Sequence, residues 1–404
     1  MRFSFVGDLV FNTKEDAKVP AVKEMKSDNG SGYGINASVA AAKNNRAYVE
    51  AMGWKNKTIK TKDTEGHSIE IDWRDRTDED VVKKVAYYRK NVIADGDDRE
   101  EFITEYDFCE YIKEHLDELA DKRCLVTGTT QENFWKGKES KRFQISNIYL
   151  IDEDDERKNK LEISTVLYFT KDSIDTDDFK NDKKIYINGY TQEFLSGKDI
   201  GEDKGDNRYI PIQVILDCSR VDFENEKHLA KMKYNLLNLG LAYKDGKIVN
   251  NLKSNKYYAN DVIIGYYNGA KDMGDAEEIT YDMLTDIQKL KVDCGLAKPE
   301  DFATKGRVFG DRIVEYRIST FPNKGDYENG IVTLDDTVSE FEDKIFVPSD
   351  DDEPPFKGMP EPVDDDEDEE KPKKKSSKVK KDPPPMPDED TDDDDDDDLG
   401  DLFG

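Results

Sequence analysis

Residues 33–54, YGINASVAAAKNNRAYVEAMGW, carry the pattern on which the fold prediction depends. From Tyr33 to Val39 apolar and polar residues alternate, as expected for a strand with one buried face. Residues 43–46 read as a turn, and residues 47–52 return as a second strand. The segment is therefore predicted to form a β-hairpin.

Strand patterns of the same kind recur along the chain, and helical spacing is less frequent. In the opening strand, Gly7 is placed as a bulge or bend. Amphipathic helices are predicted at residues 80–89, 102–119, 227–239 and 281–290. The fold class is mostly β with some helices (α+β), and further strands are expected at residues 1–11, 68–73, 124–128, 141–151, 161–169, 184–194, 209–218 and 312–319.

Three boundaries follow from these patterns. Residues 1–120 are predicted to form a β unit with appended helices. Residues 121–224 hold five strands joined by hairpin-type turns, which suits a small closed barrel or a sandwich. Residues 225–347 are a mixed α/β segment with no legible role, and residues 348–404 form a tail.

The tail has the composition of a disordered segment. The chain carries 92 acidic and 61 basic residues, a net charge of −31, and residues 348–404 alone hold 24 acidic and 8 basic residues. Low hydrophobicity, high charge and proline predict disorder. The rest of the chain is also acidic, which argues against binding duplex DNA by general electrostatics. A local basic groove stays possible because salt screens charges beyond about 10 Å at 0.1 M.

The end of the tail combines acidity with apolar residues. Seven aspartates, residues 392–398, precede Leu399, Leu402 and Phe403. An acidic arm with a small hydrophobic tip suits docking into a basic, apolar-floored pocket of a partner protein. The basic island at residues 371–381 is compatible with nuclear import, with folding back on the acidic blocks, or with contact to a nucleic-acid backbone.

Enzyme and metal signatures are absent from the sequence. His67, His115 and His228 have no metal-ligand spacing, and His115 is predicted to pack within its helix. No phosphate-binding loop, nucleophile elbow or dinucleotide fingerprint occurs, so the prediction is a non-enzymatic protein without cofactor or metal. The four cysteines are widely separated, and no apolar leader or membrane-length apolar run is present, which indicates a reduced cytoplasmic protein.

Aromatic and basic residues are interleaved on the predicted strands and hairpin loops. Unpaired bases stack on aromatic rings at roughly 1–3 kcal/mol per base, while Lys and Arg meet the phosphates. Each aromatic residue could instead cover a barrel end or an interface. The predicted DNA-binding residues are Lys43, Arg46, Tyr48, Trp54, Trp73, Arg74, Phe134, Trp135, Lys136, Lys138, Arg142, Tyr186, Tyr190, Arg208 and Tyr209.

These features together resemble phage-encoded single-stranded-DNA-binding replication proteins with OB folds. The hairpin from residues 124–128 to 141–145 resembles the first strands of an OB barrel, residues 33–54 look similar, and the acidic tail resembles the tails of that family. Bacterial tails of this type typically end in Pro-Phe, whereas Phe403 is penultimate here.

The resemblance implies two OB-like barrels, at residues 1–120 and 121–224, that coat single-stranded DNA with little sequence preference during replication or recombination. It implies an acidic tail that competes with DNA for the groove and offers Leu399, Leu402 and Phe403 to a polymerase, helicase or recombinase in the bacterial host cytoplasm. Two other functions stay open: an acidic interaction protein for basic partners, such as a histone chaperone, and a metal-dependent nuclease.

Overall fold

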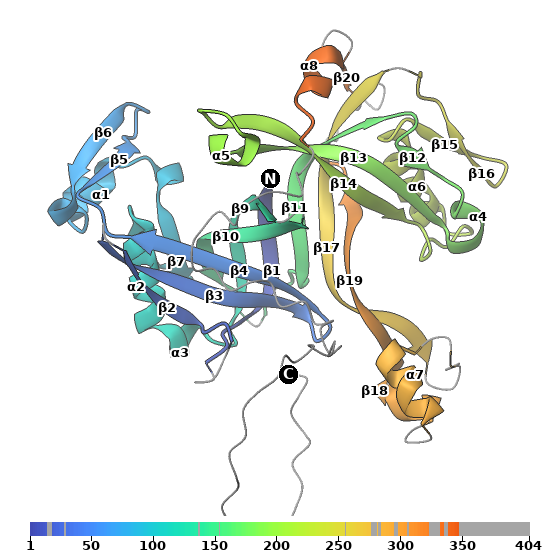
Figure 1. Ribbon diagram of the computed structural model, residues 1–404, viewed down its shortest axis with the longest axis horizontal. Coiled ribbons are helices and arrows are strands. Elements are labelled where there is room, and N and C mark those ends of the chain that lie inside the picture. Colours follow the sequence, from blue (N-terminus) through green and yellow to red (C-terminus); the bar gives the residue numbers. More distant parts are fainter. Residues whose placement is uncertain are drawn as a thin grey trace, which may run out of the picture. The chain divides into compact units, whose positions relative to one another are not determined.

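The computed structural model divides the chain into two units, residues 1–355 and 356–404. It describes residues 1–13, 18–27, 30–135, 138–152, 154–254, 256–275, 281, 284–294, 298–304, 307–322, 332–334 and 338–346. The predicted tail at residues 348–404, which includes the second unit, lies entirely outside the described residues. The described part of the first unit is mostly β with few helices (Figure 1).

The first closed barrel combines three strands near the N-terminus with two strands that lie on either side of residues 136–137 in the sequence. β1 pairs with both β3 and β9, β3 pairs with β4, and β9 pairs with β10. The ring closes where β4 and β10 run parallel, with Glu50 opposite Gln144. The order around the barrel is β1-β3-β4-β10-β9, formed by β1 (Arg2–Val10), β3 (Gly30–Ala42), β4 (Asn45–Trp54), β9 (Arg123–Trp135) and β10 (Lys138–Leu150).

The alternation of apolar and polar residues explains which side chains of these strands face the barrel core. On β4, Ala47, Val49 and Ala51 are buried, whereas Tyr48 and Met52 are exposed. The two sets alternate because successive side chains of a strand point to opposite faces. The predicted hairpin at residues 33–54 is confirmed, and its apolar set forms part of the barrel core.

A long insertion separates β4 from β9. Its helix α2 begins after Thr104, whose hydroxyl accepts a hydrogen bond from the Asp107 amide at 3.0 Å. Phe108 and Ile112 of α2 are fully buried in the core of the first barrel. The insertion contains β5 (Thr58–Lys62), β6 (Ser68–Asp72), η1 (Trp73–Asp75), α1 (Glu79–Lys84), η2 (Tyr87–Arg89), β7 (Asn91–Asp95), β8 (Asp98–Phe102), α2 (Glu105–Glu114) and α3 (Leu116–Leu119).

A second closed barrel repeats the same strand order. β11 pairs with β13 and β17, β13 pairs with β14, and β17 pairs with β19. A parallel contact between β14 and β19, with Ile215 opposite Arg317, closes the ring. Helix α6 (Glu226–Leu237) lies between the third and fourth strands, as α2 does in the first barrel; the strands are β11 (Lys160–Thr170), β13 (Lys184–Leu195), β14 (Asp206–Asp217), β17 (Tyr257–Asp275) and β19 (Arg307–Thr320).

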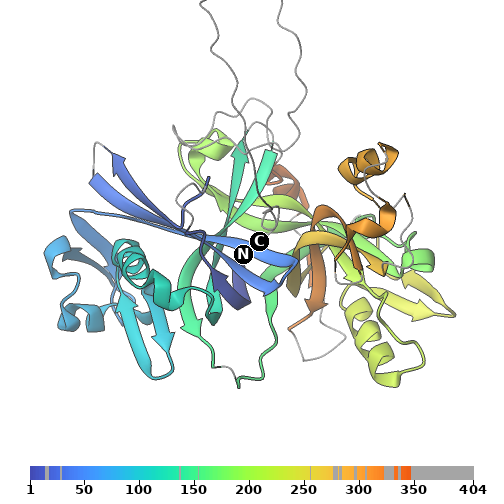
Figure 2. The same ribbon diagram turned by 90° about the horizontal axis from the view of Figure 1, so that it is seen from below.

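Shorter elements decorate the barrels. Figure 2 shows α2 beside the strands of the first barrel and α6 beside those of the second. The remaining elements are β2 (Val22–Ser27), β12 (Ile174–Asp175), α4 (Phe179–Asp182), α5 (Gly197–Ile200), β15 (Leu241–Lys244), β16 (Lys247–Asn250), α7 (Asp286–Asp293), η5 (Pro299–Phe302), β18 (Ala303–Thr304), β20 (Val332–Leu334) and α8 (Val338–Asp343).

Hydrogen bonds of the main chain and of side chains join the two barrels. The first half of β1 pairs with β11, with Arg2 opposite Ser164, so one sheet runs through both barrels. A buried hydrogen bond of 2.9 Å runs from the Thr130 hydroxyl on β9 to Glu193 on β13. The Asn268 amide of β17 donates to the side chain of Asn45 at 3.0 Å.

The structure places the barrel boundary differently from the prediction. The boundary between residues 120 and 121 falls inside the first barrel, because β9 and β10 complete it. The second barrel therefore spans residues 160–320 instead of 121–224, and the segment 225–347 supplies two of its strands. Local periodicity identifies strands but not their partners, and in both barrels the fourth strand pairs with a first strand far away in sequence.

The predicted helices are found with altered limits. The helix expected at residues 102–119 is interrupted at His115, whose ring stacks on Tyr111 at 4.0 Å, so the expected packing of His115 is confirmed. Residues 80–89 form a shorter helix, α1, followed by η2. The fourth predicted helix is displaced toward the C-terminus, to α7.

Candidate nucleic-acid interface

The insertion and the first barrel enclose a cavity of about 720 Å³, which we call the insertion groove. One wall is formed by β5, η1 and η2 of the insertion. The other is formed by β1, β9 and β10 of the barrel. Its lining includes Arg2, Trp54, Lys60, Trp73, Tyr87, Tyr88, Arg89 and Lys90.

Five aromatic residues line this groove, and one of them, Phe3, is buried in the barrel core. Val85 and Ala86 are buried and anchor the short η2 turn, which leaves Tyr87 and Tyr88 outside at 54% and 66% exposure. These values are high for aromatic side chains, which usually find apolar cover in a folded protein. Trp54 and Trp73, both predicted from the sequence, are partly buried at the groove.

Tyr87 is held in place by polar contacts. Its hydroxyl lies 3.3 Å from that of Tyr149, and the Arg99 guanidinium lies 4.7 Å from the centre of its ring. The hydrogen bond lowers the pKa of Tyr87, whereas burial raises the pKa of Tyr149 to about 12. Either hydroxyl can be the donor in this bond, which links the exposed Tyr87 ring to β10 of the barrel.

Arg2, Lys60 and Arg89 line the same groove, and the Arg89 guanidinium lies 5.6 Å from the centre of the Tyr88 ring. On β5, Ile59 packs against Ile71 and Val85, so alternation places Lys60 and Lys62 on the opposite face. Within the part of the chain that the structure describes, Arg2, Lys60, Lys62 and Arg89 form no ion pair.

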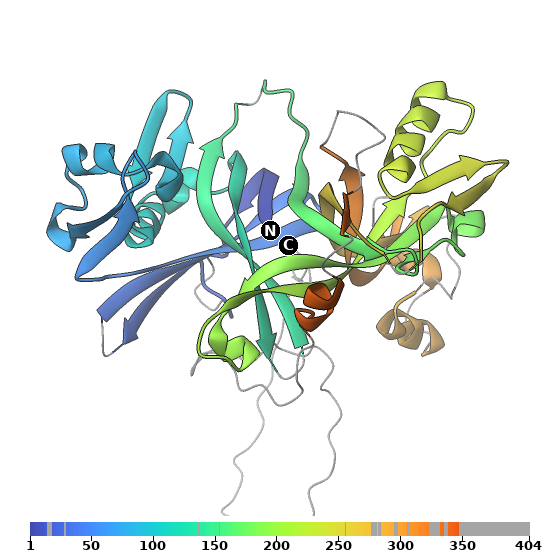
Figure 3. The same cartoon turned by 90° about the horizontal axis from the view of Figure 1, so that it is seen from above.

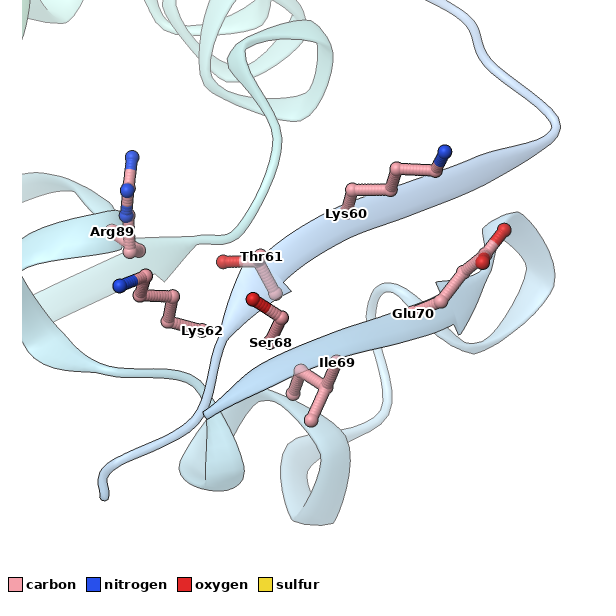
Figure 4. A pocket seen from close by; sticks show the side chains of 7 residues that line it. All are labelled: Lys60, Thr61, Lys62, Ser68, Ile69, Glu70 and Arg89. Carbon is pink, nitrogen blue, oxygen red and sulfur yellow. The ribbon is translucent and has the colours of Figure 1, made fainter. Parts of the chain in front are cut away.

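A second cavity, of about 390 Å³, continues from the insertion groove and shares Lys60, Thr61 and Arg89 with it. Figure 4 shows Lys62 and Arg89 on the same side of this cavity, near the hydroxyls of Thr61 and Ser68. Cations and hydroxyls in this arrangement can contact phosphate oxygens.

The local charge differs from that of the whole chain. Residues 55–90 contain ten basic and eight acidic residues, a net of +2 in a chain of net −31. Lys90, by contrast, is almost fully buried and held by Glu101 at 2.6 Å, so it adds little to the attraction of an anion. The groove is therefore a locally basic site on an acidic protein.

Three predicted residues of the first barrel lie away from this groove. Lys43, Arg46 and Tyr48 are near the β3–β4 turn, at the opposite end of β4 from Trp54. Eight residues along a strand span about 26 Å. Tyr48 is 58% exposed, and the Arg312 guanidinium of the second barrel lies 5.3 Å from its ring centre. The predicted residues of this barrel thus do not form one cluster.

Two predicted cations are already held by carboxylates. Arg74 bonds to Asp72 at 3.1 Å, and Arg142 lies 3.6 Å from Glu50 where the first barrel closes. Burial raises the pKa of Glu50, and the Arg142 charge partly offsets this effect. The side chains of Phe134, Trp135, Lys136 and Lys138 lie outside the described part of the structure; in the β9–β10 hairpin, Trp135 is opposite Lys138.

The second barrel presents a row of aromatic residues on its second and third strands. On β13, Tyr186 and Tyr190 alternate with buried Ile185 and Ile187, as predicted, and Phe194 continues the row at 67% exposure. Tyr209 lies on the neighbouring strand β14. We call Tyr186, Tyr190, Phe194 and Tyr209 the aromatic face; Arg208 beside it is paired with Glu202 at 2.5 Å.

Several residues of these sites were not predicted. The sequence shows four lysines, at positions 55, 57, 60 and 62, and the run Tyr87-Tyr88-Arg89-Lys90. Residues 80–89 were predicted to form a helix, so the exposure of Tyr87 and Tyr88 was not expected. Tyr168 and Tyr257, which also reach the surface of the second barrel, could have been found from alternation with buried Phe169 and Tyr258.

Comparison with known proteins gives no family assignment: no protein-family model and no curated protein matches this sequence. Among the described residues, no group of three or more His, Cys, Asp and Glu side chains could hold a metal ion. The helices of the described ranges are all too short or too polar to cross a membrane.

Proposed function

We propose that this protein binds single-stranded DNA with little sequence preference and serves DNA replication or recombination. The observation that carries the proposal is the insertion groove of an otherwise acidic chain. Four partly exposed aromatic rings line it, together with cations that form no ion pair with any residue that the structure describes. Rings of this kind can stack with any base, and the cations can follow the phosphates.

The barrel connectivity supports the proposal. In each barrel the strands, numbered in chain order, follow one another as 1-2-3-5-4, with the third and fifth strands parallel and a helix between the third and fourth. We take this as an OB-like arrangement. The faces of strands 2 and 3 in OB folds bind oligonucleotides, and the aromatic face of the second barrel lies on those strands.

In the same proposal the acidic tail has two roles. It occupies a cationic groove when DNA is absent, and it offers Leu399, Leu402 and Phe403 to a replication partner such as a polymerase, helicase or recombinase. The phage origin and the host cytoplasm belong to this proposal as well. A chain ending at Val347 should then bind single strands more tightly than the whole chain, and weaker binding would contradict the competition.

The groove is tested by removing two of its cations in the full chain. We expect Lys60→Ala/Arg89→Ala to lower affinity for oligo-dT and to reduce the salt slope by about 1.4, since each single-strand phosphate contact contributes about 0.7. Quenching of tryptophan fluorescence measures the binding at low and moderate salt.

Lys231→Ala/Lys233→Ala is the matched control, because both lysines are exposed on α6, away from the groove. The control should bind as the wild type does. Equal affinity and slope for all three proteins would contradict the assignment of the groove, and absence of quenching in the wild type would contradict the function itself.

A further inference from the structure

Helix α8 places one phenylalanine among four tyrosines of the second barrel. The ring centre of Phe341 lies 4.0 Å from that of Tyr209, 4.4 Å from Tyr257, 5.5 Å from Tyr190 and 5.8 Å from Tyr168. The tyrosines come from four strands, β11, β13, β14 and β17, and we call them the tyrosine cradle. Figures 1 and 3 show α8 beside β13 and β14. Phe341 is only 3% exposed.

The cradle lies outside the core of the barrel. The core contains Leu167, Phe169, Ile185 and Ile187, which alternate along β11 and β13 with cradle tyrosines facing the other way. The core therefore does not depend on Phe341, whose ring covers a surface that the barrel has already formed.

Polar contacts at the edge of the barrel hold the segment that follows Phe341. The main chain of Tyr209 donates to Lys344 at 2.9 Å and accepts from Phe346 at 3.0 Å. The Tyr257 hydroxyl donates to Glu342 at 3.3 Å, and Lys344 pairs with Asp206 at 3.3 Å. These contacts involve exposed or half-buried polar groups, which are individually weak because water competes for them.

An aromatic ring and acidic residues occur together in this segment, where Glu342 and Asp343 follow Phe341. The guanidinium of Arg208 donates to the main-chain oxygen of Asp343 at 3.4 Å. Opening of α8 would therefore expose the rings of the tyrosine cradle beside Arg208, whose guanidinium also pairs with Glu202.

We propose that the tyrosine cradle is a binding subsite for an unpaired nucleobase and that Phe341 occupies it when no strand is bound. This inference rests on the proposed function. A bound strand displaces α8 and inserts a base where the phenyl ring lies. The contact is stacking between rings, which carries no base readout, so the subsite accepts any base.

The Phe341→Ala variant of the full chain tests this competition. Removing the ring frees the cradle, so a larger fraction of the protein is able to bind. We therefore expect the affinity for a labelled oligo-dT to rise roughly tenfold. Adding Tyr190→Leu to the same chain should cancel the gain. Leu237→Ala, at an exposed position of α6, is the matched control and should not change the affinity.

Hydrogen exchange on the wild-type chain provides a readout that needs no substitution. The amides of Lys344, Ile345 and Phe346 are hydrogen-bonded in the DNA-free protein. Saturating oligo-dT should speed their exchange while α6 stays protected. Unchanged or slower exchange, or a Phe341→Ala variant that binds no more tightly than a binding-competent wild type, would overturn the inference and leave the proposed function intact. If neither protein binds oligo-dT, both proposals are lost.

Discussion

At the level of single residues, side-chain alternation decides which aromatic rings can meet a ligand. Phe169 is buried in the core of the second barrel, while its neighbour Tyr168 reaches the surface. The same contrast separates Ile187 from Tyr186 on β13. Because adjacent strand residues point to opposite faces, a run such as Tyr168-Phe169 supplies both core and surface.

The cysteines allow this distinction between inside and outside to be measured. Burial raises the pKa of Cys109, Cys124 and Cys218 to about 12, whereas Cys294 at the end of α7 is exposed. A thiol reacts as the thiolate, so we expect one cysteine to be labelled by iodoacetamide at neutral pH in the native protein. Mass spectrometry should locate the label at Cys294, and all four cysteines should react in denaturant. Rapid native labelling of Cys124 would show that the first barrel opens readily.

At the level of elements, the insertion of the first barrel depends on how α2 begins. Thr104 caps this helix, and its hydroxyl also donates to the Asp107 carboxylate at 2.6 Å, which in turn pairs with Arg76 at 3.0 Å. Arg76 lies 4.8 Å from the ring centre of Trp73. The cap is therefore connected through two ion-paired side chains to a wall of the insertion groove.

Replacing this cap should lower stability by a predictable amount. We expect Thr104→Ala to reduce the free energy of unfolding by about 1 kcal/mol, the usual effect of losing an N-cap. Thr104→Ser keeps the hydroxyl and should recover most of the loss. Urea denaturation followed by circular dichroism measures both variants. Equal stability of Ala and Ser at this position would show that the hydroxyl does not act as a cap.

The elements also show what the sequence can and cannot predict. The strands at residues 33–54, 141–151 and 184–194 were predictable because each alternates strongly between apolar and polar residues. The pairing of β1 with β9, β3 and β11 was not, since register and partner depend on contacts far apart in sequence. For the same reason Trp54 and Trp73 were recognised as candidates, while the groove that brings them near Tyr87 and Lys60 was not.

At the level of the whole described unit, β1 makes the two barrels mechanically dependent on each other. Its residues pair with β9 of the first barrel on one side and with β11 of the second on the other. Tyr266 of β17 packs on Phe143 of the first barrel at 5.1 Å between ring centres. Shared strands and a shared core should make the barrels unfold together.

The tryptophans make this coupling observable. All three, Trp54, Trp73 and Trp135, belong to the first barrel or its insertion. Ile187 is fully buried in the core of the second barrel, so Ile187→Ala creates a cavity there at a cost of about 2–5 kcal/mol. If unfolding is cooperative, tryptophan fluorescence should report a lower melting temperature although the substitution is in the other barrel. Leu237→Ala, at an exposed position of α6, should leave the transition unchanged. A tryptophan transition that stays at the wild-type temperature while circular dichroism shows an earlier one would mean that the barrels unfold independently, and the strand β1 would then be a joint between two separable domains.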